Sequence, residues 1–230
     1  LYGVGVGPGD PDLLTIRAAK ILKEASVVFA AASQANEVSL SLEIARPFLS
    51  SDTPVVRLDF PMTKDREKLE KAWKKAALTV RDNLPEDGAG VFLTLGDPLI
   101  YSTFVYLVRA LAKVAPDIVI DVVPGITSFQ AAAARLKTSL CEGNEAFCVL
   151  PGTASGKELA AFLRLPCSAA ILKVYRNFPA IRAALAETDR LNDAALVVRA
   201  TREDELVANP GDIDGATPYM SLIISDARRR

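Results

Sequence analysis

Three glycine-bearing turns contain the residues of this chain that could bind a ligand. The first, at residues 5–10, reads GVGPGD, the second, at residues 96–104, reads GDPLIYSTF, and the third, at residues 124–128, reads PGITS. The first two each follow a short apolar run and precede an amphipathic stretch, which places them at the carboxyl ends of buried strands. Ligands of open α/β sheets bind at those ends. The three turns therefore predict one pocket, lined by backbone, in an enzyme that acts on a small molecule.

The first turn superficially matches the fingerprint of a dinucleotide-binding loop. It departs from that fingerprint because Pro8 rigidifies the loop where it would enter its helix, and because no acidic residue for a ribose occurs in residues 28–32, after the second predicted strand. A glycine-rich turn is also structural in many proteins, since glycine supplies a positive φ at a strand end. A nicotinamide-dependent oxidoreductase remains the alternative from a different class of enzyme.

The second turn combines a close backbone approach with polar side chains. Gly96 can bring the backbone close to a ligand, and Asp97 either caps the following helix or faces a cationic or amino-bearing ligand. Ser102 and Thr103 add hydroxyl groups. Because no lysine accompanies the turn and the phosphate loop of nucleoside triphosphatases is absent, the turn suits a neutral or cationic nucleoside better than a phosphate.

The third turn and the missing histidine narrow the chemistry further. Thr127 or Ser128 can cap the following helix, which leaves the other hydroxyl for a ligand. The chain contains no histidine, which argues against a transition-metal site and against a nucleophile activated by histidine. The three cysteines have no CxxC spacing and are expected to be buried or idle thiols, so no metal site is predicted.

The composition is that of a globular protein with a large core and no charge bias. Half of the 230 residues are hydrophobic, and 27 basic residues face 28 acidic ones, for a formal net charge of -1. That balance gives no electrostatic reason to bind nucleic acid or an anionic membrane, and no apolar run is long enough to span a bilayer. Without a signal segment before the first strand, we expect a cytoplasmic protein that has neither nucleic acid nor membrane as a partner.

Apolar runs and helical periods alternate along the chain, which predicts an α/β fold. A pause at Ala115-Pro116 divides an N-terminal domain, residues 1–115, from a C-terminal domain, residues 116–230. The first should hold a mainly parallel sheet, and turn residues between the last two strands predict a mixed sheet with an antiparallel edge in the second. Strands are expected at residues 2–6, 27–31, 55–58, 91–95, 118–123, 147–150, 169–174, 194–199 and 219–225, and helices at residues 13–22, 40–48, 64–84, 101–114 and 127–136.

The three turns, in this order and spacing, resemble those of the tetrapyrrole methylase family, and the resemblance extends to the closing PYMSLIIS. The finer pattern, in GDPLIYSTF, PGITSFQAAAA and residues 60–77, is similar to the branch that methylates carbon 20, a meso carbon, of precorrin-2 or its cobalt-containing form in cobalamin biosynthesis. The resemblance implies two α/β domains with the active site in the cleft between them, a small tetrapyrrole substrate and a homodimer. Methylation at another ring position, and a non-catalytic tetrapyrrole carrier, are the alternatives.

The same resemblance implies that S-adenosylmethionine is the cofactor and S-adenosylhomocysteine its product. The N-terminal domain would supply the tetrapyrrole side of the cleft and the second turn, and the C-terminal domain further cofactor-binding loops. The residues expected to line the cofactor are Pro8, Leu95, Gly96, Asp97, Ile100, Tyr101, Ser102, Thr103, Thr127, Ser128, Val174, Tyr175, Ala200, Tyr219 and Met220.

The implied chemistry needs no activated side chain, because the meso carbon of the reduced macrocycle is itself the nucleophile. The enzyme must align that carbon with the methyl group, exclude water and let a proton leave. The candidate bases for that proton are Tyr101, Asp97 and Glu142. The carboxylates of the substrate would meet scattered cations such as Arg17, Lys20, Lys173 or Arg176.

Overall fold

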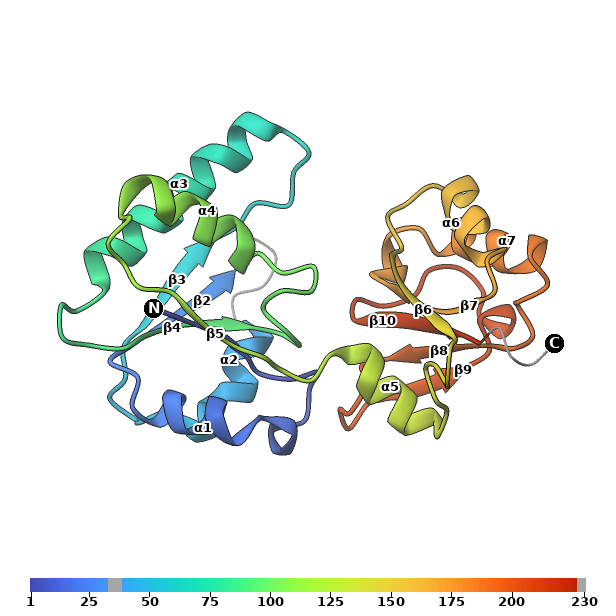
Figure 1. Cartoon of the computed structure of the whole chain (residues 1–230), viewed down its shortest axis with the longest axis horizontal. Coiled ribbons are helices and arrows are strands. Elements are labelled where there is room, and N and C mark those ends of the chain that lie inside the picture. Colours follow the sequence, from blue (N-terminus) through green and yellow to red (C-terminus); the bar gives the residue numbers. More distant parts are fainter. Residues whose placement is uncertain (33–38, 227–230) are drawn as a thin grey trace. The chain divides into compact units, whose positions relative to one another are not determined.

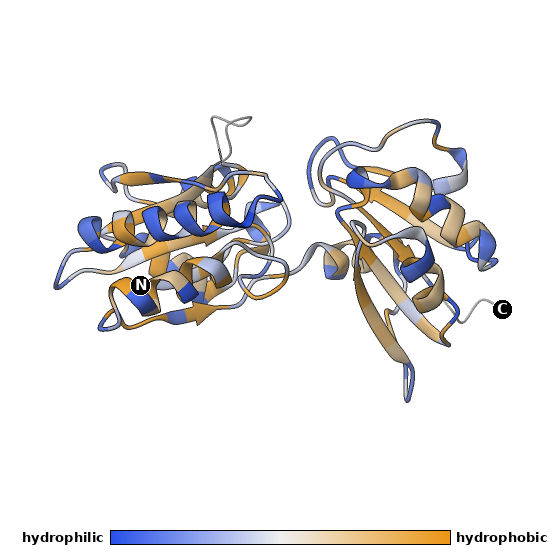
Figure 2. Ribbon diagram, turned by 90° about the horizontal axis from the view of Figure 1, so that it is seen from above, coloured by the Kyte–Doolittle hydropathy of each residue, from blue (hydrophilic) through white to orange (hydrophobic). Residues whose placement is uncertain are grey.

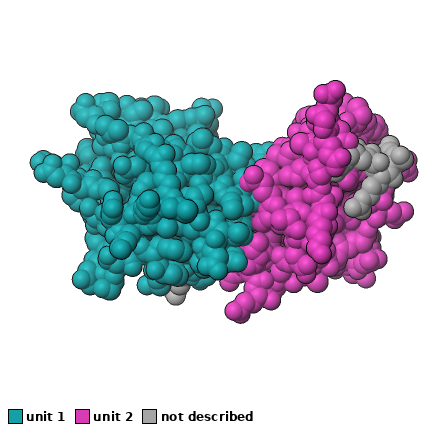
Figure 3. Space-filling view, turned by 60° about the horizontal axis from the view of Figure 1, so that its bottom comes forward, with its two compact units in different colours: residues 1–127 teal, residues 128–230 magenta. Residues whose placement is uncertain are grey.

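The computed structural model describes residues 1–32 and 39–226 and divides into two compact units, residues 1–127 and residues 128–230 (Figure 3). Each unit has its own five-stranded sheet. None of the described helices is long and apolar enough to cross a membrane. The basic residues at positions 228–230 lie outside the described residues.

The sheet of the first unit is parallel throughout and has the strand order β3-β2-β4-β1-β5. Its strands are β1 (Tyr2–Gly5), β2 (Val27–Ala32), β3 (Val55–Asp59), β4 (Gly90–Thr94) and β5 (Asp121–Val123). The three glycine-bearing turns follow β1, β4 and β5. These strands are adjacent in the sheet, where β1 lies between β4 and β5. Because the strands are parallel, all three turns emerge at the same edge of the sheet, as the sequence predicted.

Helices cover both faces of this sheet (Figure 1). The helices α1 (Ile16–Lys23) and α2 (Leu40–Ala45) pack against one face, and α3 (Arg66–Asn83) and α4 (Phe104–Val114) pack against the other. Every residue of β4 is buried, as expected of a central strand covered on both sides. The helices carry hydrophilic residues on their outer surfaces, whereas the strands are mainly hydrophobic (Figure 2).

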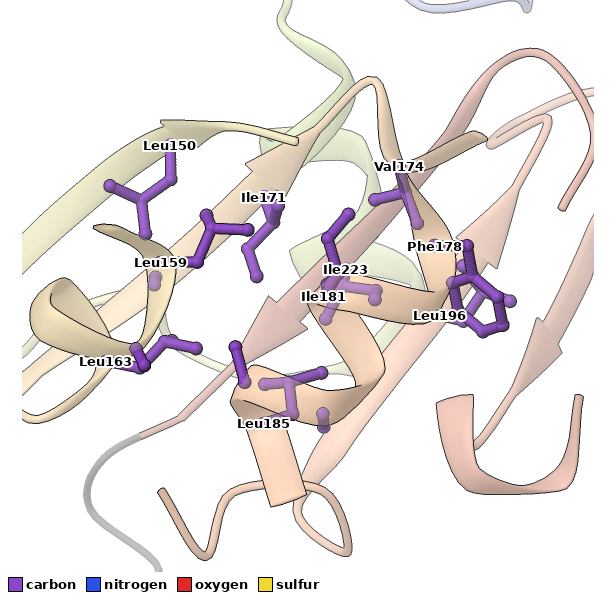
Figure 4. Packing of buried hydrophobic residues seen from close by; sticks show 14 of the residues in the cluster. Leu150, Leu159, Leu163, Ile171, Val174, Phe178, Ile181, Leu185, Leu196 and Ile223 are labelled. Carbon is purple, nitrogen blue, oxygen red and sulfur yellow. The ribbon is translucent and has the colours of Figure 1, made fainter. Parts of the chain in front are cut away.

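The second unit has a mixed sheet with the order β6-β7-β10-β8-β9. Only β6 and β7 pair in parallel, and β9 forms an antiparallel edge beside β8, so the predicted mixed sheet is confirmed. The helices α6 and α7 bury the large apolar cluster of Figure 4 against one face, and α5 packs against the other (Figure 1). The elements are α5 (Ser128–Leu136), β6 (Ala146–Pro151), α6 (Gly156–Leu163), β7 (Cys167–Leu172), α7 (Phe178–Glu187), β8 (Ala194–Val198), β9 (Leu206–Ala208) and β10 (Ser221–Ser225).

Four features of the fold differ from the sequence prediction. The units divide between Thr127 and Ser128 rather than after residue 115, because β5 pairs with β1 and completes the first sheet. The short strand β9 lies in a stretch for which we expected turns rather than a helix and named no strand. The helices α6 and α7 were not predicted. The helix α4 begins at Phe104 instead of Tyr101, whose φ of 49° is left-handed and therefore not helical.

Candidate active site

The first two turns are joined by backbone hydrogen bonds at the carboxyl edge of the first sheet. The Gly96 N–H donates to the Gly7 carbonyl at 2.7 Å, and the Gly7 N–H donates to the Gly96 carbonyl at 3.3 Å. This isolated antiparallel bridge lies just beyond the parallel pairing of β1 with β4. Both glycines have a positive φ, which other residues adopt only with strain. The turns therefore form one rigid element.

The third turn approaches this element closely at Gly125, which lies against Gly5 and Gly96. A Cβ atom on Gly125 would lie 2.1 Å from the Gly96 carbonyl oxygen, and one on Gly5 would lie 2.5 Å from the same atom. No larger residue fits at either position without a shift of the backbone. The glycines at positions 5 and 125 are thus explained by packing, which is the structural interpretation of a glycine-rich turn.

Gly96 differs from its neighbours because space is open beside it. A Cβ atom on Gly96 would meet its nearest atoms, the Ile126 carbonyl oxygen and the Thr127 Cα, only at 3.9 Å. The residue has a φ of 70° and lies where the three turns meet. A Cβ-sized group therefore has room beside the backbone of Gly96, whereas it would clash at Gly5 and Gly125.

Asp97 connects the second turn to the third. One carboxylate oxygen, Oδ1, accepts a hydrogen bond from the Leu99 N–H at 2.8 Å, and the other, Oδ2, accepts one from the Gly125 N–H at 3.1 Å. The side chain thus stabilises its own turn and does not cap the following helix, because Thr103 occupies the N-cap position of α4, and it also holds a turn that lies far away in the sequence. This arrangement positions the backbone of both turns.

The tip of the second turn presents apolar surface. The residues Leu99, Ile100 and Tyr101 are exposed by 61%, 40% and 45%. Tyr101 has a left-handed φ of 49°, and desolvation raises the pKa of its phenol above the ordinary tyrosine value. Exposed apolar and aromatic groups on a strained loop are typical of a ligand contact.

The two hydroxyl residues at the start of α4 have different surroundings. The Ser102 Oγ accepts a hydrogen bond from the Phe104 N–H at 3.0 Å and lies 3.4 Å from the Thr94 Oγ1. Thr103 occupies the N-cap position, but its side chain makes no capping hydrogen bond. The residues of the cofactor set that the structure brings to this edge are Pro8, Leu95, Gly96, Asp97, Ile100, Tyr101, Ser102, Thr103 and Thr127.

The rest of that set lies in the second unit, where Ser128 begins α5. Strand pairing brings the other residues to one end of the second sheet. Leu172, the last residue of β7, pairs with Leu222 near the start of β10, and the Arg199 N–H after β8 donates to the Met220 carbonyl at 2.8 Å. The segments after β7, after β8 and before β10 are therefore neighbours. The residues they contribute are Val174, Tyr175, Ala200, Tyr219 and Met220.

The side chains at this end of the second sheet divide into buried and exposed ones. Val174 is fully buried in the cluster under α6 and α7, and Ala200 is buried on the α5 side. These two residues can therefore offer a ligand little more than their backbone. The rings of Tyr175 and Tyr219 meet edge to face with centroids 5.1 Å apart, and Tyr219 is 55% exposed. Desolvation, and secondarily Tyr175, raise the pKa of Tyr219, while Arg176 opposes the shift.

Left-handed backbone is concentrated at the same end of the sheet. Among the described residues, seven other than glycine have a positive φ, and four of them are Lys173, Arg199, Thr201 and Met220. A fifth is Tyr101, in the second turn. Such conformations cost free energy and are often kept where a ligand is held. The sequence contains no signal for them, because none of these residues is a glycine.

The remaining candidates lie elsewhere. Glu142 is exposed in the loop before β6, where its N–H donates to the Glu145 carboxylate at 2.8 Å. Arg17 is paired with Asp121 at 2.6 Å. Lys20 lines a groove of about 600 Å³ between α1 and the turn that follows α2. Within residues 1–32 and 39–226, no group of three or more cysteines and carboxylates is arranged to hold a metal ion.

Comparison with known proteins identifies the family. The model of the Tetrapyrrole (Corrin/Porphyrin) Methylases matches residues 1–214. This chain belongs to the tetrapyrrole methylase family. The family predicted from the three turns is thereby confirmed, and with it the prediction that the protein is a methyltransferase.

Relatives of this methylase are similar along most of its length. The cobalt-precorrin-2 C(20)-methyltransferase of Salmonella typhimurium is 34% identical over 97% of this chain and 94% of its own. The probable cobalt-precorrin-2 C(20)-methyltransferase of Methanocaldococcus jannaschii is 35% identical with the same coverage. The precorrin-2 C(20)-methyltransferase of a Sinorhizobium species is 34% identical, again over 97% and 94%. These relatives have the activity that the sequence predicted.

Solved structures of tetrapyrrole methylases share the fold. The cobalamin biosynthetic enzyme cobalt precorrin-4 methyltransferase superposes with a TM-score of 0.73 at 22% identity, covering 98% of this methylase and 93% of that chain. The uroporphyrin-III C-methyltransferase from Thermus thermophilus, complexed with S-adenosylhomocysteine, gives a TM-score of 0.67 at 24% identity, with coverages of 98% and 96%. The predicted fold of two α/β domains is therefore confirmed.

Proposed function

We propose that this methylase transfers the methyl group of S-adenosylmethionine to carbon 20 of precorrin-2 or of its cobalt-containing form. The observation that carries the proposal is the joined set of three turns, in which an added Cβ atom would clash at Gly5 and Gly125 but not at Gly96. Three relatives at 34–35% identity over nearly the whole chain, all named for C(20) methylation of this substrate, support the choice of ring position.

The residues present suit S-adenosylmethionine, which supplies an electrophilic methyl group on a sulfonium. The open backbone at Gly96 and the hydroxyls of Ser102, Thr103 and Thr127 match the needs of an uncharged ribose and adenine. The second turn carries no lysine, so it is unsuited to a phosphate. In the second unit, the proposed cofactor set is completed by Ser128, by the backbone at Val174, Ala200 and Met220, and by the paired rings of Tyr175 and Tyr219.

When bound, S-adenosylmethionine would supply its methyl group to the meso carbon of the reduced macrocycle, with S-adenosylhomocysteine as the other product and the meso proton passing to solvent. The chain's contribution is to hold the reacting carbons in line and to exclude water. We propose that Asp97 acts as a positioning residue, because both of its oxygens accept backbone hydrogen bonds. The Tyr101 phenol stays neutral near neutral pH, since desolvation raises its pKa, and it is therefore unsuited to act as the base.

The first test is calorimetric titration of the purified protein with S-adenosylhomocysteine, with NADH as the control. Binding of the first ligand and not of the second supports the methylase chemistry over a nicotinamide-dependent oxidoreductase. If S-adenosylhomocysteine fails to bind, the titration is repeated with tetrapyrrole present, which tests whether the substrate must bind first. Binding of neither ligand in both titrations contradicts the proposal.

The second test is the position of the new methyl group. Incubation with S-adenosylmethionine and the metal-free or the cobalt-loaded tetrapyrrole is followed by mass spectrometry and by carbon NMR of the product. Methylation at another position is the second candidate, because a cobalt-precorrin-4 C(11)-methyltransferase of Priestia megaterium is 29% identical over 61% of this chain. A methyl group at carbon 11 would favour that candidate, and tetrapyrrole binding without transfer would favour a carrier.

We also propose that the active enzyme is a cytoplasmic homodimer. The basis is the family resemblance alone. Light scattering of the eluted protein measures the mass of the assembly, and a monomer that is active in methyl transfer would contradict the dimer.

A further inference from the structure

Two cations lie beside the tyrosine pair of the second unit. Lys173 is the N-cap residue and Arg176 the last residue of the single-turn helix η3 (Val174–Arg176), which lies just after β7. The Arg176 Nε donates a hydrogen bond to the Tyr175 hydroxyl at 2.8 Å, and the guanidinium carbon lies 4.9 Å from the centre of the Tyr175 ring. Tyr219 packs edge-on against the same ring. The guanidinium is thus held in place by an aromatic platform rather than extended freely into solvent.

Lys173 is brought close to this guanidinium by strained backbone. Its φ of 60° turns the chain sharply at the end of β7, within the group of left-handed residues at this end of the sheet. Desolvation and the charge of Arg176 lower the pKa of the Lys173 ammonium. Two like charges held together at a partly desolvated site repel each other, and an anion bound between them relieves that repulsion.

We propose that Arg176, assisted by Lys173, is a specificity-determining residue that binds a carboxylate of the ligand at this end of the second sheet. The inference rests on the proposed methyl transfer and narrows the candidate carboxylate-binding cations to these two. A planar guanidinium matches the geometry of a carboxylate and pairs with it through two parallel hydrogen bonds. Two sources of carboxylate exist in the proposed reaction: the amino-acid end of the cofactor and the acidic side chains on the rim of the tetrapyrrole.

The test compares three variants with the wild-type protein. Arg176→Gln removes the charge, Arg176→Lys keeps the charge without the planar fork, and Arg164→Gln is the matched control. Arg164 lies in the same unit and pairs with Glu187 on the surface. Each protein is titrated calorimetrically with S-adenosylhomocysteine and with methylthioadenosine, which lacks the amino-acid carboxylate, and the KM for the tetrapyrrole is measured. Thermal denaturation checks that each variant is folded.

If Arg176 binds the carboxylate of the cofactor, Arg176→Gln should weaken S-adenosylhomocysteine binding by roughly ten- to a hundredfold and leave methylthioadenosine binding unchanged. If Arg176 instead binds a carboxylate of the tetrapyrrole, Arg176→Gln should raise the KM for the tetrapyrrole by a similar factor and leave the affinity for S-adenosylhomocysteine unchanged. Either result supports the proposal, with Arg176→Lys intermediate and Arg164→Gln like wild type.

The proposal is overturned if Arg176→Gln changes neither quantity by more than about twofold, a difference below 0.5 kcal/mol. It is equally overturned if the variant weakens methylthioadenosine as much as S-adenosylhomocysteine, because the loss would then come from disturbed tyrosine packing. Failure of the methyl-transfer function has a different signature, since the wild-type protein itself would then bind no S-adenosylhomocysteine.

Discussion

The Asp97 carboxylate accepts a hydrogen bond from the Gly125 N–H at 3.1 Å, although 28 positions separate the two residues in the sequence. The same side chain accepts a second hydrogen bond from the Leu99 N–H. A residue of the predicted cofactor set thus determines the geometry of two turns at once. Its removal should therefore affect both the stability of the fold and the binding of the ligand.

We expect Asp97→Ala to lower the free energy of unfolding by about 1–3 kcal/mol, because two backbone N–H groups lose a charged acceptor. S-adenosylhomocysteine binding should weaken with it as the second and third turns separate. Denaturant unfolding and calorimetry measure the two effects. Asp117→Ala, an exposed aspartate before β5, is the control and should leave both quantities unchanged. An Asp97→Ala protein of normal stability that binds normally but has no turnover would instead identify a catalytic base.

Alanine substitutions should separate the two roles of the glycines in these turns. Gly125→Ala forces a Cβ atom to within 2.1 Å of the Gly96 carbonyl oxygen, so the fold should be destabilised by about 1–3 kcal/mol or more. Gly96→Ala meets no atom within 3.9 Å and should cost only the strain of its positive φ, about 1–2 kcal/mol, while S-adenosylhomocysteine binding weakens.

The matched control for Gly96 is Gly215→Ala, at a residue that also has a positive φ and has open space around it. It should show the same small loss of stability in thermal denaturation and full ligand affinity. Equal affinities in the Gly96→Ala and wild-type proteins would show that the open space beside Gly96 does not receive the cofactor.

How far the sequence predicted this fold depends on the length and regularity of each element. The helix expected at residues 64–84 is α3 (Arg66–Asn83), because Asp65 caps it and apolar residues recur at helical spacing. The three-residue strand β9 was not predicted, and β5 was predicted at residues 118–123 but assigned to the second domain, because such short strands are formed by pairing with distant strands rather than by local preference. The domain boundary lies after Thr127 instead of after residue 115 for the same reason, since β5 pairs with β1 in the first sheet.

The sequence predicted the parts of the candidate site that are built from glycine-bearing turns. It did not predict the parts in which residues other than glycine have a left-handed backbone. Turns at neighbouring strand ends can be inferred from Gly and Pro, and the structure brings all three together. The left-handed Lys173, Arg199 and Met220 leave no trace in the sequence, because their backbone is set by the antiparallel pairing of β10. Nor could the sequence reveal that both oxygens of Asp97 are engaged by backbone.

Tyr101→Phe should reduce turnover by less than about tenfold, because desolvation raises the pKa of Tyr101 and keeps the phenol protonated near neutral pH. General-base catalysis typically contributes roughly a hundredfold or more, and a tyrosinate base would make the wild-type rate rise with pH. Steady-state kinetics at several pH values tests both points. Tyr101 would be assigned as the base if Tyr101→Phe lowered turnover a hundredfold or more, left the affinity for S-adenosylhomocysteine unchanged and abolished the rise of the rate with pH.

The raised pKa of Tyr219 predicts a pH-dependent loss of stability in alkaline solution. Since the folded state holds this proton more tightly than the unfolded state, the unfolded chain releases it first, above about pH 10. Stability should therefore fall as pH rises from there through the folded pKa, and less so in Tyr219→Phe. Arg176→Gln should raise the pKa of Tyr219 further, because the guanidinium charge opposes the shift. Ultraviolet titration of tyrosinate follows the ionisation, and a lower pKa in Arg176→Gln would contradict this account.

Glu205 should act on the Ala200 segment without contacting a ligand itself. One carboxylate oxygen accepts the N–H of the left-handed Thr201 at 2.8 Å, and the other pairs with Arg135 at the end of α5. Glu205→Ala should lower the free energy of unfolding by about 1–3 kcal/mol and weaken S-adenosylhomocysteine binding, because the strained turn loses its acceptor. Arg135→Gln, which keeps that acceptor, should have the smaller effect on binding. Denaturant unfolding with calorimetry separates the two, and lost stability with unchanged affinity would place the Ala200 segment outside the cofactor site.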